Sequence, residues 1–374
     1  MIKILIRLAV IVLRFINLFF RPVSTKAKVT IISRQADEPT LDIRLLNDCL
    51  QRNGIKTAVL TKTLKKTPAG AASYCIQLLR QMYHIASSRV VVIDGYCILV
   101  SVLPKKKDQK VIQMWHALGA IKKFGWQNID NPDGHGKVVS EAMSMHRNYD
   151  YVLTPGSVTG KYFAEAFKIS EDKLVYCGLP RIDFLKDTSD DAEAVKYRME
   201  TEYPEISSKT NVLYVPTFRK NGELCIEKLV CEFDFSEFNL IIKKHFLDKG
   251  DYSWAEKAGA IVDTDYSSME WLRVCDKVVT DYSAIAFEAA ILDREIYIYE
   301  PDSETYEHNV GLNVDMHKEA ISDYVCGSEE ELFMKLRIPY DKNAVTAFRN
   351  KYIEIPLDNC TQQLCDFISE LLVM

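Results

Sequence analysis

The sequence predicts an α/β protein of two Rossmann-like domains that face a cleft, preceded by an amphipathic N-terminal helix. Short apolar runs typical of buried strands alternate with helix-like patterns along most of the chain. This alternation is typical of parallel sheets covered by helices. The 374 residues suffice for two domains of ordinary size. The first 20 residues differ from the rest in composition and predict the separate helix.

The overall composition is that of a soluble globular protein, with 48% hydrophobic and 26% charged residues. The formal net charge of −5 argues against non-specific nucleic-acid binding, so we expect no nucleic-acid partner. The ten cysteines form no Cys-x-x-Cys pair and lie at no zinc-like spacing from a histidine. We therefore expect reduced thiols and no metal site. Dinucleotide and P-loop motifs are absent, and we expect no cofactor.

Residues 1–22 predict an amphipathic helix that associates with a membrane. Lys3, Arg7, Arg14 and Arg21 fall within roughly 40° of one another on a helical wheel, among mostly aliphatic and aromatic residues. The inner arginines interrupt the apolar run that a spanning helix needs, and no clear cleavage site for a signal peptide follows. The pattern fits a helix in the membrane surface with its basic stripe toward anionic headgroups. A spanning anchor and a helix packed on the protein are the alternatives.

The first Rossmann-like domain is predicted over residues 28–187. Its elements follow from apolar runs of strand length and from helical spacing of apolar residues. Strands are expected at 28–33, 57–61, 90–93, 111–115, 151–154 and 173–176, and helices at 41–50, 68–87, 138–147 and 158–168. A loop rich in Gly, Pro, Asp and Asn is expected over 125–136.

The second Rossmann-like domain is predicted over residues 208–355, after a charged, Ser-rich linker at 187–210. Strands are expected at 211–215, 238–243, 260–262, 278–279 and 296–299, and helices at 267–274, 284–292, 329–336 and 341–352. A C-terminal helix is expected within 356–374.

Basic and hydroxyl residues follow several predicted strands, and parallel strands place their carboxyl ends, where ligands bind, at one edge of a sheet. After the strand at 111–115 comes His116, whose imidazole can accept a hydroxyl proton near neutral pH. Gly119 allows close approach of a ligand, and Lys122 and Lys123 supply positive charge. A hydrogen-bonded loop histidine with two solvated lysines is the alternative.

The stretch Val278–Leu292 reads VVTDYSAIAFEAAIL, a short strand, a hydroxyl-rich turn and a helix. Ser283 is the predicted N-cap, and the first helix amides suit a phosphate. Thr280, Asp281 and Ala284 complete the turn. An ordinary βα turn that binds nothing is the alternative.

Further candidates lie at other strand ends. Thr217 and Arg219 follow the strand NVLYV, and with the helix start they would make a diphosphate pocket. His245 ends the strand at 238–243 in the basic sequence KKH. Arg181 could hold a phosphate as a planar fork or form a structural pair with Asp183.

Glu300 follows the strand IYIY, where it could reach a ribose or serve as an ordinary loop acid. His135, His146 and His317 are given no role, because a solvated or capping histidine is the default.

The motifs from residue 110 to 320 resemble, in order, those of the CDP-glycerol glycerophosphotransferases: WHALGAIKKFG, GLPRID, VPTFR, VTDYSAIAFEAAILDREIYIY and GLNVD. The resemblance implies a GT-B-type fold with an N-terminal acceptor domain and a C-terminal donor domain. It implies transfer of glycerol phosphate from CDP-glycerol to a membrane-linked polyol-phosphate or saccharide acceptor, with release of CMP. The implied setting is synthesis of teichoic-acid-like or capsular polymers at the cytoplasmic face of the cell membrane, by a peripheral membrane protein.

The resemblance also assigns roles. His116 becomes the catalytic base. The donor would be bound by Thr217, Arg219, His245, Thr280, Asp281, Ser283 and Ala284. Ala117, Phe246 and Val310 stand where the family usually has glycine, proline and arginine. The last two departures leave CDP-ribitol open as donor. The sequence also fits a GT-B glycosyltransferase that uses a nucleotide sugar, or a non-catalytic membrane scaffold.

Overall fold

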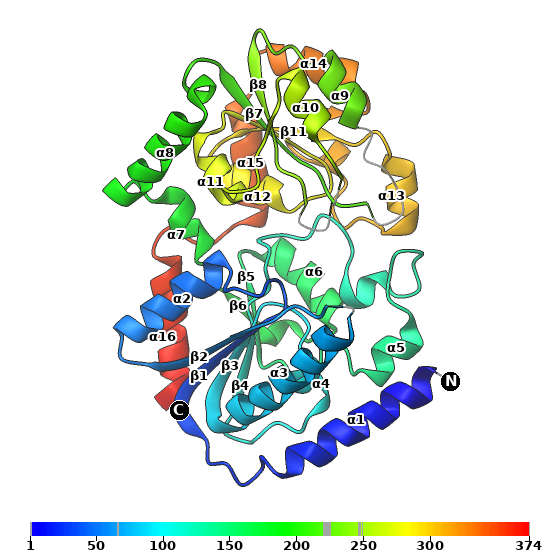
Figure 1. The fold of residues 1–374 in the computed structure, drawn as a ribbon, viewed down its shortest axis with the longest axis vertical. Helices are drawn as coiled ribbons and strands as arrows, with labels where there is room; N and C mark the ends of the chain where they lie inside the picture. The colour runs from blue at the N-terminus through cyan, green and yellow to red at the C-terminus, as the bar shows by residue number, and fades with distance from the viewer. Residues whose placement is uncertain (1, 66, 220–225, 246–247, 249, 374) are drawn as a thin grey trace. The chain divides into compact units, whose positions relative to one another are not determined.

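The computed structural model describes residues 2–65, 67–219, 226–245, 248 and 250–373. The chain divides into two compact units, shown in Figure 1. Unit 1 comprises Met1–Leu118, Phe124–Asp183 and Ile355–Met374, and unit 2 comprises Gly119–Lys123 and Phe184–Glu354. Each unit holds one parallel sheet with helices on both faces, which confirms the predicted pair of Rossmann-like α/β domains.

Unit 1 is built on a six-stranded parallel sheet in the order β2-β1-β3-β4-β5-β6. Its strands are β1 (Lys26–Ser33), β2 (Lys56–Thr61), β3 (Ser88–Ile93), β4 (Lys110–Gln113), β5 (Tyr151–Thr154) and β6 (Leu174–Tyr176). The central strands are rich in Val and Ile and buried on both faces, as expected for a parallel sheet.

Helices cover both faces of this sheet. One face carries α2 (Leu41–Arg52) and α16 (Cys360–Val373), and the other α3 (Pro68–Ser87) and α4 (Ile98–Val102) (Figure 1). Asp183 fixes the returning C-terminal segment, because its carboxylate accepts hydrogen bonds from the backbone N–H groups of Cys360 (2.9 Å) and Thr361 (2.7 Å). The remaining helices are α1 (Ile2–Leu18), α5 (Lys137–Ala142), α6 (Ser157–Phe167) and α7 (Arg181–Lys186), which crosses into unit 2.

Unit 2 is built on a second parallel sheet in the order β12-β11-β10-β7-β8-β9. Its strands are β7 (Thr210–Val215), β8 (Phe238–Ile242), β9 (Ile261–Val262), β10 (Lys277–Thr280), β11 (Glu295–Tyr299) and β12 (Val325–Cys326). Its helices are α8 (Asp190–Glu202), α9 (Ile226–Glu232), α10 (Ser253–Ala258), α11 (Ser268–Val274), α12 (Ile285–Ile291), α13 (Ser303–Asn309), α14 (Glu329–Arg337) and α15 (Lys342–Tyr352). The pair α12 and α15 packs against β11, as does α14 (Figure 1).

Each sheet reverses its chain order once. The reversal lies between β1 and β3 in unit 1 and between β7 and β10 in unit 2. At such a switch point the neighbouring connections leave toward opposite faces, and the carboxyl ends of the two strands flank a ligand-binding crevice. The fold therefore directs attention to the residues that follow these four strands.

Several predicted boundaries need correction. The expected linker at 187–210 contains α8 and a short 3₁₀ turn, Pro204–Ser207, within unit 2. It resembles a linker because α8 buries only Ala192 and Met199. The segment Gly119–Lys123 belongs to unit 2 rather than to the first domain. The helix expected at 138–147 ends at Ala142, after which Ser144, His146 and Asn148 take left-handed backbone angles.

Candidate active site

A strained turn follows β4 in unit 1. Trp115 has a φ of 61°, a conformation that costs a bulky residue on the order of 1–3 kcal/mol. The Gln113 side chain compensates by accepting a hydrogen bond from the Trp115 backbone N–H at 3.0 Å. The Trp115 indole also stacks on Phe124, with ring centroids 4.8 Å apart. The turn is thus held by its surroundings, and it fixes the position of the next residue, His116.

His116 is half-buried and oriented through one ring nitrogen. Its Nδ1 lies 2.8 Å from the backbone oxygen of Asp94 and 3.1 Å from the Gln35 side-chain amide. The shorter contact is to a carbonyl oxygen, which can only accept a hydrogen bond and so favours the tautomer with the hydrogen on Nδ1. The Gln35 atom at 3.1 Å is Nε2, itself a donor, which donates to Nδ1 only in the other tautomer. In the favoured tautomer His116 Nε2 is the basic nitrogen, as a general base requires.

Asp94 lies at the switch point of unit 1, just after β3. Its side chain is 3% exposed, and its Oδ2 accepts a hydrogen bond from the Ser33 hydroxyl at 2.7 Å. Within the described part of the chain, Asp94 Oδ1 is buried without a hydrogen-bond partner. Burial raises the pKa of this carboxyl to about 6, the nearby Asp42 adds to the shift, and the Ser33 hydrogen bond opposes it. The Asp94 side chain thus has a pKa near neutrality, and the backbone oxygen of the same residue contacts His116.

Arg219 organises the switch point of unit 2. Its guanidinium binds Asp281 through Nη1 at 2.9 Å, and Asp302 through Nε at 2.7 Å and Nη2 at 3.1 Å. The rings of Tyr282 and Tyr306 stack on each other at 3.9 Å, and the guanidinium lies over both. The carboxylates and aromatic faces make Arg219 a fixed part of the site rather than a solvated cation.

Thr217 connects the two strands that flank this switch point. Its backbone N–H donates to both carboxylate oxygens of Asp281, at 2.9 and 3.1 Å. Its hydroxyl oxygen is buried and has no hydrogen-bond partner among the described residues. The neighbouring hydroxyl of Thr280 instead donates to the Val215 carbonyl at 2.7 Å. Of these two threonines, Thr217 is the one whose hydroxyl lacks a hydrogen bond in the described structure.

A second cation reaches the same site from the segment Gly119–Lys123. This segment pairs with residues 311–314, where Asn313 N–H donates to Ile121 O at 2.7 Å. Burial lowers the pKa of Lys122, and the neighbouring charge of Asp281 counteracts the shift. Burial and the Lys122 charge in turn lower the pKa of His245, which follows β8. Lys122 and His245 therefore lie close enough to influence each other.

Glu300, which follows β11, contacts His317, whose Nε2 lies 2.8 Å from Glu300 Oε1. Burial raises the pKa of Glu300, and His317 opposes the shift. The expected strand-end acid is thus present at this edge of the sheet, and its partner is a histidine that the sequence left without a role.

Comparison with known proteins identifies the family. Residues 16–370 match the model of the CDP-glycerol:poly(glycerophosphate) glycerophosphotransferases. This chain belongs to that glycerophosphotransferase family. The teichoic acid ribitol-phosphate primase of Bacillus spizizenii is 31% identical over 295 residues, covering 75% of this chain and 74% of that one. The teichoic acid glycerol-phosphate primase of Bacillus subtilis is 28% identical over 305 residues, covering 79% and 77%.

Solved structures agree on the fold. The wall teichoic acid polymerase TagF superposes with a TM-score of 0.76 at 18% identity, over 99% of this chain and 97% of that one. A TagF variant soaked with CDPG gives a TM-score of 0.73. Both likenesses support the GT-B-like pair of Rossmann domains in this glycerophosphotransferase.

Several candidate residues have other structural roles than the sequence indicated. Ser283 is not the N-cap, because α12 begins at Ile285 after Ala284, and the Ser283 hydroxyl lies 3.5 Å from the Ile285 N–H. The close approach expected at Gly119 is made by the Phe287 ring, which lies 2.1 Å from the position that a Cβ would take.

Arg181 pairs with Asp42 through Nε at 2.9 Å, a partner that the sequence did not indicate. The roles of Thr280, Asp281 and Ala284 in donor binding stay predictions, as does that of Lys123.

Asp94, Asp302, Tyr282, Tyr306 and His317 are site residues that sequence reasoning missed. Tyr282 and Asp302 stand within three residues of strand ends that were singled out, which is the signal that could have found them. Tyr306 and His317 lie farther along the chain, and Asp94 follows a strand whose end was not singled out. Their residue types alone gave no indication, since loop acids and tyrosines are common.

Proposed function

We propose that this protein is a glycerophosphotransferase that moves glycerol phosphate from CDP-glycerol to a lipid-linked acceptor in teichoic acid synthesis, releasing CMP. Membership in the CDP-glycerol:poly(glycerophosphate) glycerophosphotransferase family, over residues 16–370, carries this proposal. This chain covers about three quarters of the length of each of the two related teichoic acid primases, which supports the proposal.

The donor is assigned to unit 2. A nucleoside diphosphate brings several anionic oxygens, and the switch point of unit 2 offers complementary groups. Lys122 and His245 supply donors, and the buried hydroxyl of Thr217 lacks a partner among the described residues. Arg219 is already bound to Asp281 and Asp302, so we assign it to fixing the site rather than to gripping the phosphates as an open fork.

The acceptor hydroxyl is assigned to His116 in unit 1. The hydroxyl oxygen attacks the β-phosphorus of CDP-glycerol, and its proton passes to His116 Nε2. The bond from the β-phosphorus to the bridging oxygen breaks, and CMP leaves with the electron pair. Positioning and charge stabilisation dominate the catalysis of such phosphoryl transfers. The hydrogen bond from Nδ1 to Asp94 supports this role, because it leaves Nε2 as the basic nitrogen.

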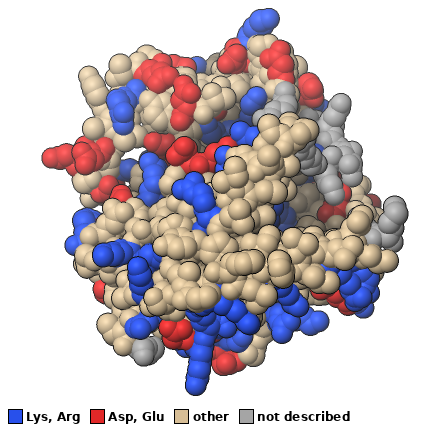
Figure 2. Space-filling model, turned by 60° about the horizontal axis from the view of Figure 1, so that its bottom comes forward, with Lys and Arg blue, Asp and Glu red and all other residues tan. Residues whose placement is uncertain are grey.

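Association with the membrane surface is assigned to α1. Eight large apolar side chains of this region are between 48% and 70% exposed: Ile4, Leu5, Leu8, Ile11, Val12, Phe15, Leu18 and Phe19. One narrow face, with Val10 and Asn17, packs on unit 1. Figure 2, which brings this end of unit 1 forward, shows a broad uncharged surface with Lys and Arg gathered beside it. Among the described residues, no helix has the length and apolarity needed to cross a bilayer.

An exposed apolar strip bordered by cations fits a helix that lies in an anionic membrane surface. The variant Leu8→Glu/Phe15→Glu tests this, because both side chains are exposed and the fold should tolerate the change. We expect it to lose binding to phosphatidylglycerol vesicles. If it binds them as well as the wild type does, the membrane role of α1 is wrong.

A donor screen tests the central proposal. Purified protein is incubated with a phosphopolyol acceptor and labelled CDP-glycerol, CDP-ribitol or a UDP-sugar, and CMP or UDP release is measured. We expect CMP release from CDP-glycerol. The similarity to a ribitol-phosphate primase makes CDP-ribitol the second candidate. Release of UDP alone would instead support a nucleotide-sugar glycosyltransferase.

A further inference from the structure

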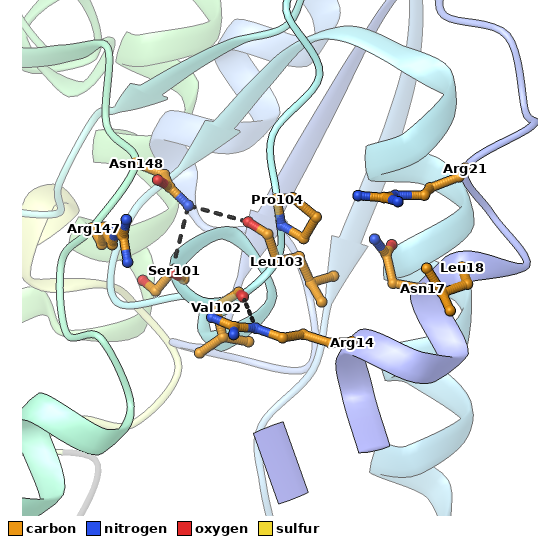
Figure 3. Close-up of a pocket in the computed structure, with 10 residues that line it drawn as sticks. All are labelled: Arg14, Asn17, Leu18, Arg21, Ser101, Val102, Leu103, Pro104, Arg147 and Asn148. Carbon is orange, nitrogen blue, oxygen red and sulfur yellow. Dashed lines mark hydrogen bonds between the residues drawn. The ribbon is translucent and has the colours of Figure 1, made fainter. Parts of the chain in front are cut away.

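A pocket lies beneath α1, at the edge of its exposed apolar strip. It measures about 370 Å³ and is enclosed by the end of α1 with Arg21, the last residues of α4 with Leu103 and Pro104, and Arg147 with Asn148 (Figure 3). All of these residues belong to unit 1. The pocket is separate from the His116 group, and nothing in the proposed transfer reaction uses it.

Three guanidinium groups line this pocket, from Arg14, Arg21 and Arg147, and no carboxylate does. None of the three forms an ion pair within the described part of the chain, whereas Arg181 and Arg219 elsewhere are bound to carboxylates. Arg14 is oriented by its Nε, which donates to the Val102 carbonyl at 3.0 Å. The pocket therefore gathers positive charge that the protein itself does not neutralise.

The wall of the pocket is a fixed structure. Asn148 adopts a φ of 72°, and its side-chain amide donates to the carbonyls of Val100 (2.9 Å) and Leu103 (3.2 Å) at the end of α4. Ser101 in the same wall is buried. A ligand with several acceptor oxygens would satisfy the arginines.

We propose that this pocket binds the phosphate of an anionic membrane lipid headgroup. Planar guanidinium groups suit phosphate oxygens, which accept two hydrogen bonds side by side. Leu18 lines the pocket and is 48% exposed, and the neighbouring Phe19 is 70% exposed. A lipid whose phosphate is held here would place its acyl chains beside an apolar surface. This favours a lipid over free phosphate as the ligand.

This inference rests on the proposed membrane role of α1, and vesicle binding by the full-length protein can separate the two. The vesicles contain phosphatidylcholine with either phosphatidylglycerol or oleate, matched in surface charge. Both should attract α1, but only phosphatidylglycerol brings a phosphate whose negative charge no choline ammonium offsets. We expect the wild type to prefer phosphatidylglycerol at least fivefold. Arg147→Gln should abolish that preference and weaken binding by about tenfold or more, the effect of a lost charge-assisted hydrogen bond.

Arg147 is the informative position because it lies outside α1 and forms no side-chain bond that holds the helix in the described structure. Arg147→Lys keeps the charge but not the fork and should recover only part of the binding. Arg7→Gln is the matched control, because Arg7 lies on α1 but does not line the pocket. It should cost about fivefold, the contribution of one cation near an anionic surface, on both vesicle types. Thermal unfolding of each variant checks folding.

Each outcome decides between the proposals. Equal losses for Arg147→Gln and Arg7→Gln on both vesicle types would overturn the pocket and leave the membrane role of α1 standing. Binding of the wild type to neither vesicle type would overturn both. Tight binding of inorganic phosphate, measured by calorimetry, would make this a site for the free ion and overturn the lipid assignment. The wild type could also prefer phosphatidylglycerol vesicles in a way that depends on Arg147 and yet fail to use CDP-glycerol. That result would overturn only the proposed reaction.

Discussion

Asp94→Asn should make the protein more stable at neutral pH and no more stable in acid. The pKa of Asp94 rises from 3.8 to about 6, mainly through burial. Each pKa unit corresponds to about 1.4 kcal/mol, so the charged carboxylate costs the folded state about 3 kcal/mol at pH 7.5. Below about pH 3 the group is protonated in both the folded and unfolded states, and this cost is absent. It develops as the pH rises from about 4 through about 6.

Asparagine removes the charge at nearly constant volume, and its oxygen can still accept the Ser33 hydrogen bond. Its amide N–H groups take the place of an oxygen that has no partner in the described structure, which reduces the gain. We therefore expect Asp94→Asn to raise the free energy of unfolding by about 1–3 kcal/mol at pH 7.5, with no gain at pH 3. Urea unfolding of unit 1 at the two pH values, followed by hydrogen exchange of its core strands, measures the difference.

Asp42→Asn is the matched control. Asp42 is also buried, but it accepts hydrogen bonds from the backbone N–H and the Nε of Arg181, at 2.8 and 2.9 Å. Neutralising it removes the carboxylate charge opposite the largely buried Arg181 guanidinium and should cost about 3–5 kcal/mol. If Asp94→Asn destabilises the protein as Asp42→Asn does, or gains equally at both pH values, the account of Asp94 as a strained buried charge is refuted. Because the backbone oxygen that holds His116 is unchanged, any fall in kcat would report on the carboxylate itself.

Four further variants test the site. His116→Ala should lower kcat by about 10²–10⁴ with little change in KM for CDP-glycerol, measured by CMP release. Lys122→Met should raise that KM by about tenfold. Because the pKa of Lys122 is lowered, the wild type should lose affinity for the donor as the pH rises and the lysine loses its proton, and Lys122→Met should abolish this pH dependence. Gly119→Ala should cost about 1–3 kcal/mol in urea unfolding, since its Cβ would overlap the Phe287 ring. Thr217→Val should leave the unliganded protein as stable as the wild type or more so, yet weaken CDP-glycerol binding several-fold in calorimetry.

The sequence predicted those parts of the fold that depend on local patterns. The helix at 68–87 and the strand at 151–154 have the expected bounds, because apolar spacing and β-branched runs mark them directly. Helix α8 could not be predicted this way, since it has almost no apolar face. The transfer of Gly119–Lys123 to unit 2 and the return of α16 to unit 1 depend on contacts between distant segments, which a local pattern does not contain.

The same limit applies to the site. Its place at the strand ends could be predicted, because parallel sheets gather ligand-binding residues at one edge. The partners of the two arginines could not. Arg181 and Asp42 are 139 residues apart in sequence, and Arg219 and Asp302 are 83 apart. A guanidinium that follows a strand suits a phosphate and a carboxylate equally well, and only the tertiary neighbours decide which it binds.

The groups left unsatisfied in unit 2 indicate what its ligand must supply. The Thr217 hydroxyl is buried without a partner in the described structure, and burial disfavours the charge of Lys122. Each arrangement costs stability, while Arg219 is fully paired with acids and needs no ligand. One anionic group with several acceptor oxygens would relieve both costs at once, since it accepts from the hydroxyl and stabilises the ammonium. An uncharged sugar would relieve only the first. The double variant Lys122→Met/Thr217→Val should therefore lose less binding free energy for the donor than the sum of the two single variants. The reason is that both side chains contact the same phosphate in the proposed complex.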